Sequence, residues 1–295
     1  AIGASMFGSA GMGVDYRSSG ATNGAMDAEM YSMRSNLLLL KFSVPIAYGQ
    51  DNWSVGIAPV MMYGSLDMSL DMPTGPGAYK DVGNGSSSSF GVGIELGASY
   101  TLPDLGLTLG AVYHSSIEME YKDQIKTVGN EFGYVGANAF SNKLEQPAEY
   151  GLGIDWTQGD ISLTFDWKNV RWENARGYQD FGWQNQDVYA LGAEYRMDDL
   201  SLRAGFNYGG NPIEQSNDGR LNLLNQGMFP AVTQRHYTLG AGYQFTKNVG
   251  VDIAATYGVS GDSNRHTDNP AFGMPQQPHS FAGDTTVTND QFAFS

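Results

Sequence analysis

The sequence predicts an all-β fold, an antiparallel transmembrane β-barrel, and three observations support this class. Apolar residues alternate with small or polar residues through most segments. The connections between these segments are alternately very short and long, and aromatic residues collect near the segment ends. A strand of such a barrel presents one face to lipid and the other to the lumen, so a period of two is expected along each strand.

The strands are expected wherever this alternation is continuous. The clearest case runs from Tyr237 to Phe245, where aromatic and aliphatic residues alternate with Thr, Gly and Gln. Similar segments cover residues 40–48, 53–63, 90–100, 105–113, 150–156, 161–167, 189–195, 202–208 and 249–257. If the apolar face contacts lipid, the charged residues of the opposite face line the lumen: Glu95, Asp155, Asp166, Glu194, Arg196, Arg203 and Asp252.

The connections indicate how the barrel is oriented. Short turns rich in Asp, Asn and Gly are expected at 49–52, 101–104, 157–160, 197–199 and 246–248. Long polar loops are expected at 66–89, 118–149, 172–187, 209–234 and 258–290. Short periplasmic turns and long extracellular loops are typical of outer-membrane barrels. A soluble β-sandwich also has alternating strands, but it requires neither aromatic strand ends nor connections of strictly alternating length.

Composition excludes several other classes. The 295 residues carry a net charge of -15 and only 16 Lys and Arg, which argues against nucleic acid as a partner. The absence of Cys excludes disulfides and thiolate metal sites. No charge-free stretch reaches the roughly 18 residues of a membrane-spanning helix. The four His are scattered, so we expect no metal site, and no motif indicates a cofactor.

Several ordered motifs in the second half resemble those of a known family. They are "LEQPAEYGLGIDW" from Leu144, "LTFDWKNVRW" from Leu163, "DVYALGAEYRMDDLSLRAGFNYGGNPI" from Asp187 and "RHYTLGAGYQFTKNVGVDIAATYG" from Arg235. Weaker matches are "ASMFGSAGMGVDYRSSG" and "NWSVGIAPVMMYG" in the first 64 residues. Together they resemble the outer-membrane hydrophobe-transport family typified by the FadL long-chain fatty-acid transporter, which includes aromatic-hydrocarbon channels.

The resemblance implies a fourteen-stranded barrel plugged by an N-terminal hatch. About twelve strands can be counted in residues 1–295, which we interpret as a single transmembrane barrel domain. The chain begins where the family's third strand would begin and ends within the closing strand. We therefore expect the hatch and the first strands to be missing from this chain.

The implied function is passive uptake of hydrophobic small molecules, such as long-chain fatty acids or aromatic hydrocarbons, without catalysis. The resemblance implies capture in a groove between extracellular loops and exit through a lateral opening where the third strand kinks. The kink would lie at Gly8, Gly11 and Gly13, because glycine permits a bulge or bend. Ordinary small lumen-facing residues are the equally simple alternative for these glycines.

Apolar residues in the long connections are candidates for the groove. Met and aromatic side chains suit a surface that must adapt to varied apolar shapes. The candidates are Leu66, Met68, Leu70, Met72, Phe132, Tyr134 and Phe140. Packing of loops against each other would use the same residue types, and we expect it as the main role of the apolar residues in 221–229. Candidate partners for a carboxylate head group are Arg17, Lys122, Lys126 and Arg235, although such cations more often form structural ion pairs.

Other functions remain open at this stage. A general porin for polar solutes would need facing acidic and basic ladders, and a structural or surface-recognition barrel would use its loops as a binding surface. His114 is followed by Ser115 and Ser116, but a nucleophile also needs an orienting group. The expected partners are a hydrophobic ligand and outer-membrane lipid or lipopolysaccharide, with a monomer favoured.

Overall fold

The computed structural model describes residues 1–17, 32–75, 78–230, 233–261, 263–268 and 282–294. Within them, one antiparallel sheet follows a path of twelve strands, which confirms the expected number. In path order these are β1 (Ser5–Asp15), β2 (Arg34–Ser43), β4 (Trp53–Gly75), β6 (Ser87–Leu102), β7 (Leu107–His114), β8 (Glu149–Gln158), β9 (Ile161–Val170), β10 (Gln186–Met197), β11 (Leu200–Gly209), β12 (Thr233–Thr246), β13 (Val249–Ser260) and β16 (Gln291–Phe294).

Four shorter strands and two helices complete the described elements. The strands β3 (Ile46–Gln50) and β5 (Ala78–Val82) pair with β4, and β14 (Ser263–Asp268) pairs with β15 (Ala282–Val287). The helices are α1 (Ile125–Glu131) and α2 (Gly219–Met228), with short 3-10 turns at Pro103–Leu105, Gly136–Asn138 and Trp172–Asn174. No helix in the described part of the chain has the length and apolar character to cross a membrane.

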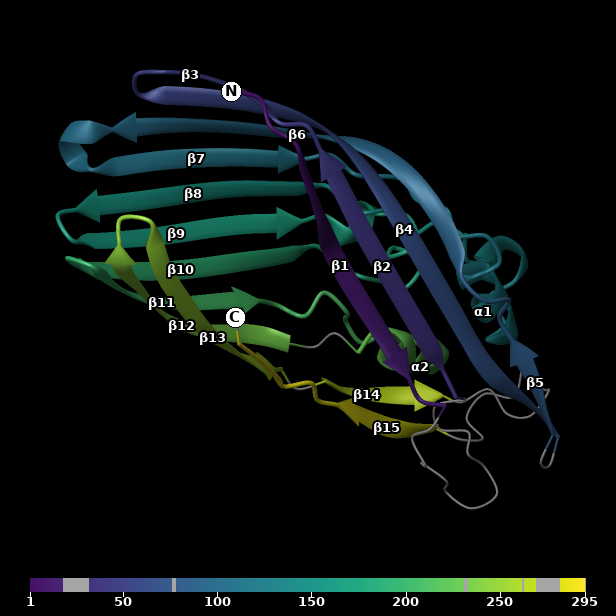
Figure 1. Cartoon of the computed structure of the whole chain (residues 1–295). Coiled ribbons are helices and arrows are strands. Elements are labelled where there is room, and N and C mark those ends of the chain that lie inside the picture. The colour runs from purple at the N-terminus through teal and green to yellow at the C-terminus, as the bar shows by residue number, and fades with distance from the viewer. Residues whose placement is uncertain (18–31, 76–77, 231–232, 262, 269–281, 295) are drawn as a thin grey trace.

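The two ends of the curved sheet differ strongly (Figure 1). Tight turns close one end, where Asp198 and Gly106 adopt left-handed φ values of 46° and 62°. Asp and Gly accept this conformation more readily than most residues. The helices α1 and α2, strand β5 and the β14–β15 hairpin all lie at the opposite end. We call this second end, including the loops that pack there, the cap.

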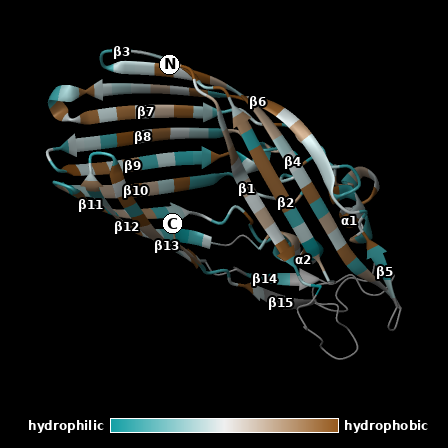
Figure 2. Ribbon diagram, in the orientation of Figure 1, coloured by the Kyte–Doolittle hydropathy of each residue, from teal (hydrophilic) through white to brown (hydrophobic). Residues whose placement is uncertain are grey.

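The outward face of the strands is apolar and exposed. Figure 2 shows the strands banded in brown and teal, as alternation requires. Val92 is 77% exposed and Leu239 is 68% exposed, values that only an apolar surrounding such as lipid would make favourable for a whole face. The inward neighbours are small, polar or charged, which agrees with the predicted lumen-facing residues.

Strand β4 corrects the predicted loop at 66–89. It runs without a break to Gly75, pairs with β2 and β6, and then turns back into β5. Along it the apolar face changes sides. Up to Tyr63 the outward residues are apolar, whereas beyond Gly64 the inward residues Leu66 and Met68 are apolar and buried, and the outward neighbours are Ser and Asp. The outer part of β4 therefore belongs to the cap.

Candidate functional site

The cap encloses one buried hydrophobic cluster, which we call the cap core. It joins inward residues of β2 and β4 to the segments 117–144, 175–183 and 213–229. The predicted groove residues Leu66, Met68, Leu70, Phe132, Tyr134 and Phe140 are all part of it, and Met72 packs against it. The apolar residues of α2 are buried in the same cluster, so packing is their role in the structure, as expected.

Methionine and aromatic residues give the cap core its character. Five of its buried residues are methionines: Met33, Met62, Met68, Met119 and Met228. Aromatic rings form a continuous series, in which Tyr134 stacks on Phe140 at 4.3 Å, Phe140 meets Phe181 at 5.0 Å, and Phe181 meets Phe229 at 4.9 Å. Flexible thioethers beside rings can repack around apolar groups of different shape. The cluster could therefore admit varied hydrophobes.

A polar clasp holds two loops of the cap together. Tyr134 donates a hydrogen bond of 3.0 Å to Asp218, and Arg220 donates to the same carboxylate at 2.8 Å. Arg220 also donates to the Phe132 carbonyl oxygen at 3.0 Å. Burial would raise the pKa of Asp218, but the hydrogen bonds from Arg220 and Tyr134 outweigh it and hold that pKa below its usual value. Asp218 is also the N-cap of α2, where its side chain accepts a hydrogen bond from the Arg220 backbone amide.

Tyr121 places a hydroxyl group inside the apolar part of the cap core. The side chain is fully buried, and within the described residues its hydroxyl has no hydrogen-bond partner. Burial raises the pKa of Tyr121. The hydroxyl lies directly over Gly64 of β4, where a Cβ atom would overlap it. Gly64 is thus required for the close approach of this ring to the strand.

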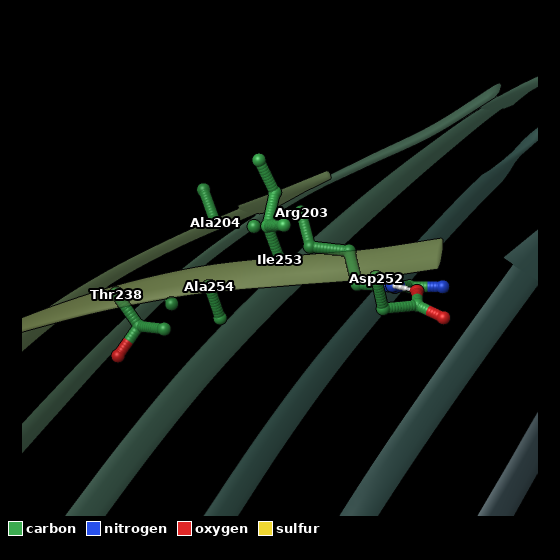
Figure 3. A pocket seen from close by; sticks show the side chains of 8 residues that line it. Arg203, Ala204, Thr238, Asp252, Ile253 and Ala254 are labelled. Carbon is green, nitrogen blue, oxygen red and sulfur yellow. Dashed lines mark hydrogen bonds and ion pairs between the residues drawn. The ribbon is translucent and has the colours of Figure 1, made fainter. Parts of the chain in front are cut away.

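The inward wall below the cap carries ion pairs between strands. Arg203 donates to Glu194 at 2.5 Å and to Asp252 at 2.7 Å, and Arg196 also pairs with Glu194. Figure 3 shows Arg203 and Asp252 side by side at a hollow of about 260 Å³, with Thr238 and Ala254 at its other side. These ion pairs place charged groups on the inward wall, whereas the cap core is apolar.

A second group of ionisable residues lies on the same wall. Lys41 of β2 pairs with Glu95 of β6, and His114 Nδ1 lies 2.8 Å from the Glu95 carboxylate. The neighbouring Ser115 hydroxyl accepts a hydrogen bond of 2.9 Å from the Ile94 amide. Sequence reasoning placed Glu95 inward but missed its partners, because Lys41 is 54 positions away.

Strand β1 has an irregularity within the predicted kink. Its register against β2 shifts between Gly8 and Ala10, so that Ser9 is an additional residue. Because of this shift, Gly8, Gly11 and Gly13 all lie on the outward face. Their partners on β2 are Leu40, Leu38 and Asn36. The alternative reading of these glycines as lumen-facing is therefore wrong, and their role in a lateral opening stays a prediction.

The structure does not gather the predicted head-group cations. Arg17 is exposed and donates to Asp15 at 2.9 Å, and Lys122 and Lys126 are exposed on the cap. Arg235 lies on the outward face of β12, with its guanidinium 6.0 Å from the centre of the Tyr208 ring. None of these four residues faces the cap core.

Comparison with known proteins agrees with this architecture. The family described as outer membrane protein transport protein (OMPP1/FadL/TodX) matches residues 1–294. The chain belongs to this family. It is an outer-membrane protein, so the short-turn end is periplasmic and the cap is extracellular.

Individual members of the OMPP1/FadL/TodX family are distant in sequence. Outer membrane protein P1 of Haemophilus influenzae is 23% identical over 184 residues, which is 58% of this chain and 38% of that protein. The chain thus matches well under half the length of this relative. A Pseudomonas aeruginosa FadL homologue has a TM-score of 0.66 and 16% identity, over 99% of this chain and 72% of that one.

Two further solved structures share the fold. The Pseudomonas putida toluene transporter TodX has a TM-score of 0.59 and 18% identity, over 89% of this chain and 74% of that one. The Ralstonia pickettii toluene transporter TbuX has a TM-score of 0.56 and 17% identity, over 89% of this chain and 73% of that one. These likenesses establish the β-barrel fold of the FadL/TodX family for this chain.

Proposed function

We propose that this chain is a channel for passive uptake of hydrophobic small molecules, such as long-chain fatty acids or aromatic hydrocarbons. The observation that carries the proposal is the cap core, an apolar cluster rich in Met and aromatic residues outside the membrane and above a polar wall. A general porin has no need of such a cluster at its entrance. Membership of the FadL/TodX family also supports hydrophobe transport over the porin alternative.

The groove residues would act in capture. Leu66, Met68, Phe132 and Phe140 would separate or repack to admit the cargo, since Met and aromatic side chains accommodate several packings. A bulge next to Gly8 would then weaken pairing of β1 and favour exit into the membrane. Ser115 and His114 have structural partners on the wall, and we assign them no catalytic role.

Uptake measurements test this function directly. The full chain would be expressed in a Gram-negative strain that lacks its own hydrophobe transporter, and entry of labelled oleate, toluene and sucrose would be compared. We expect faster entry of at least one hydrophobe and unchanged entry of sucrose. Sucrose entry without hydrophobe entry would identify a porin, and no entry of any solute would favour a surface-recognition barrel.

We also propose that Arg235 contacts the head groups of outer-membrane lipid or lipopolysaccharide. It faces outward at the extracellular end of β12, beside the ring of Tyr208. An Arg and a Tyr at this level suit the boundary between lipid tails and phosphate groups. Arg235→Gln should reduce retention of lipopolysaccharide by the purified protein, whereas Lys247→Gln at the periplasmic end should not.

A further inference from the structure

Two basic side chains of the inward wall meet at a single oxygen atom. Oε1 of Glu95 pairs with Lys41 Nζ, and His114 Nδ1 lies 2.8 Å from the same Oε1 atom. An ionised carboxylate only accepts hydrogen bonds, so a neutral His114 makes this contact with its proton on Nδ1. Glu95 therefore connects β7 to β2, although β4 and β6 lie between them in the sheet.

His114 lies between two glutamates. Strand β7 pairs with β6 on one side and with β8 on the other, and the residues directly opposite His114 are Glu95 and Glu149. Glu149 is paired in turn with Lys168 of β9 at 3.1 Å. The charged groups that face His114 from the neighbouring strands are thus these two carboxylates, with Lys41 and Lys168 as their partners. Histidine is the member of this row whose charge changes most readily near neutral pH.

Protonation of His114 would place two positive groups on the same Glu95 oxygen. Like charges at this separation repel each other. The imidazolium would be retained by the carboxylates on both sides of it. Among the described residues, Lys41 has no second carboxylate within 4.0 Å. Lys41 is therefore the cation that would leave Glu95.

Lys41 also contacts strand β1 next to its bulge. Its Nζ lies 5.5 Å from the centre of the Phe7 ring, and Phe7 is the residue opposite Lys41 in the register of the two strands. A cation in this position is attracted to the face of the ring. The register shift of β1 begins at the next residue, Gly8, and a bulge weakens strand pairing. Since Glu95 holds the ammonium group in place, loss of the ion pair would also free Phe7.

We propose that Glu95 and Lys41 transmit the charge of His114 to strand β1, so that acid releases Phe7 and loosens β1 at its bulge. The coupling follows contiguous contacts from β7 to β1, each of which is an ion pair or a cation–ring contact. The inference adds control by pH to the exit route proposed above. It rests on that proposed function only for its effect on cargo.

A spin label on β1 tests the coupling. The chain has no Cys, so Met6→Cys provides a single attachment site, next to Phe7 and on the outward face. Leu239→Cys on β12 is the matched control, because the two native side chains are both 68% exposed. Electron paramagnetic resonance would measure the mobility of each label between about pH 8 and pH 5, on the full chain in lipid nanodiscs.

We expect the ratio of mobile to immobile label at Met6→Cys to rise about fivefold or more as the pH falls, and the label at Leu239→Cys to stay unchanged. His114→Gln, which remains neutral, should keep the β1 label immobile at every pH. Lys41→Met should make it mobile at every pH. Lys41→Arg should restore the pH dependence, because Arg also pairs with carboxylates and aromatic rings. Lys168→Met, which changes the other lysine of the row, should behave like wild type.

A β1 label that does not respond to pH in wild type would overturn the proposal. A response that persists in folded His114→Gln, or is lost in folded Lys168→Met, would also overturn it. The wild-type profile decides the matter if these variants do not fold, since it requires no substitution in the row. Toluene entry would be measured at the same pH values, because toluene has no ionisable group. A responding label with unchanged toluene entry would refute the exit route at β1 and not the coupling.

Discussion

The Tyr134 hydroxyl donates a hydrogen bond to the Asp218 carboxylate, and this bond connects two extracellular loops. The two residues are 84 positions apart in the chain. The same carboxylate caps α2 and receives Arg220, so one charged group holds three parts of the cap in place. The packing of the cap core against these loops therefore depends on the ionisation of Asp218.

Acid should loosen the cap. The pKa of Asp218 is lower in the folded protein than the value of about 3.9 for an unfolded chain. Its stabilisation is therefore complete above that value and is lost as the pH falls through the folded pKa. The protection factor of the segment 132–140, which is the intrinsic exchange rate at each pH divided by the observed rate, should fall below about pH 4. In Asp218→Asn, which preserves the N-cap, this protection factor should already be low at about pH 7 and should change less with pH.

The matched control for this experiment is Asp160→Asn, which changes a periplasmic turn far from the cap. Its exchange profile in the segment 132–140 should follow that of wild type at every pH. Identical profiles for wild type and Asp218→Asn would show that the clasp does not control the cap.

Gly64→Ala should destabilise the cap through a steric clash with Tyr121. A Cβ atom at this position overlaps the buried hydroxyl, and overpacking of this kind costs about 1–3 kcal/mol. Tyr121→Phe removes the hydroxyl and should restore most of the lost stability in the double variant. Denaturant unfolding of the four proteins gives the coupling energy. Gly97→Ala, which has open space around it, should change stability by less than about 0.5 kcal/mol. Additive effects of the two substitutions would contradict the clash.

A charge should be tolerated on one face of β6 and not on the other. Leu96 is outward and exposed, whereas its neighbour Gly97 faces inward. Leu96→Lys should therefore cost about 2–4 kcal/mol of folding free energy in lipid vesicles, while Gly97→Lys should cost much less. Equal costs for the two variants would mean that the assignment of the faces is wrong.

Filling the outward glycines of β1 should slow hydrophobe uptake. Gly8 and Gly11 have open space at their Cβ positions, so Val can be accommodated there. A Cβ atom at Gly13 would lie 2.8 Å from the Ser35 carbonyl oxygen, so this residue is left unchanged. In Gly8→Val/Gly11→Val, the barrel should fold normally and oleate uptake should fall, because β-branched residues favour regular strand pairing. Unchanged uptake would exclude these positions from the exit route.

Much of the barrel could be predicted because its signal is local. Alternation from Tyr237 to Phe245 is a property of neighbouring residues, and β12 forms there as expected. The outer part of β4 was missed because its apolar face changes sides near Gly64. Apolar and polar residues still alternate beyond Gly64, but there Leu66 and Met68 are inward and Ser65 and Asp67 are outward. This exchange of the apolar and polar faces is visible in the sequence and was the signal for a longer strand.

The site could be predicted only in part. The Met and aromatic content of the long connections identified some residues of the cap core, but Met119, Tyr121 and Phe181 were missed. Their partners depend on contacts between distant segments, as when Arg265 reaches the carbonyl oxygen of Ile213 across 52 positions. The outward orientation of Arg235 follows from its register opposite Tyr208, and its residue type alone does not predict that orientation.

The Met228 carbonyl oxygen accepts a hydrogen bond of 2.6 Å from the Ser35 hydroxyl, 193 positions earlier in the chain. The cap core therefore cannot be completed until the loop between β11 and β12 has reached the cell exterior. Contacts of such long range form slowly, because a large loop must close first. We therefore expect the cap to form after the strands, and until then its methionines and aromatic rings would be exposed to other hydrophobic segments.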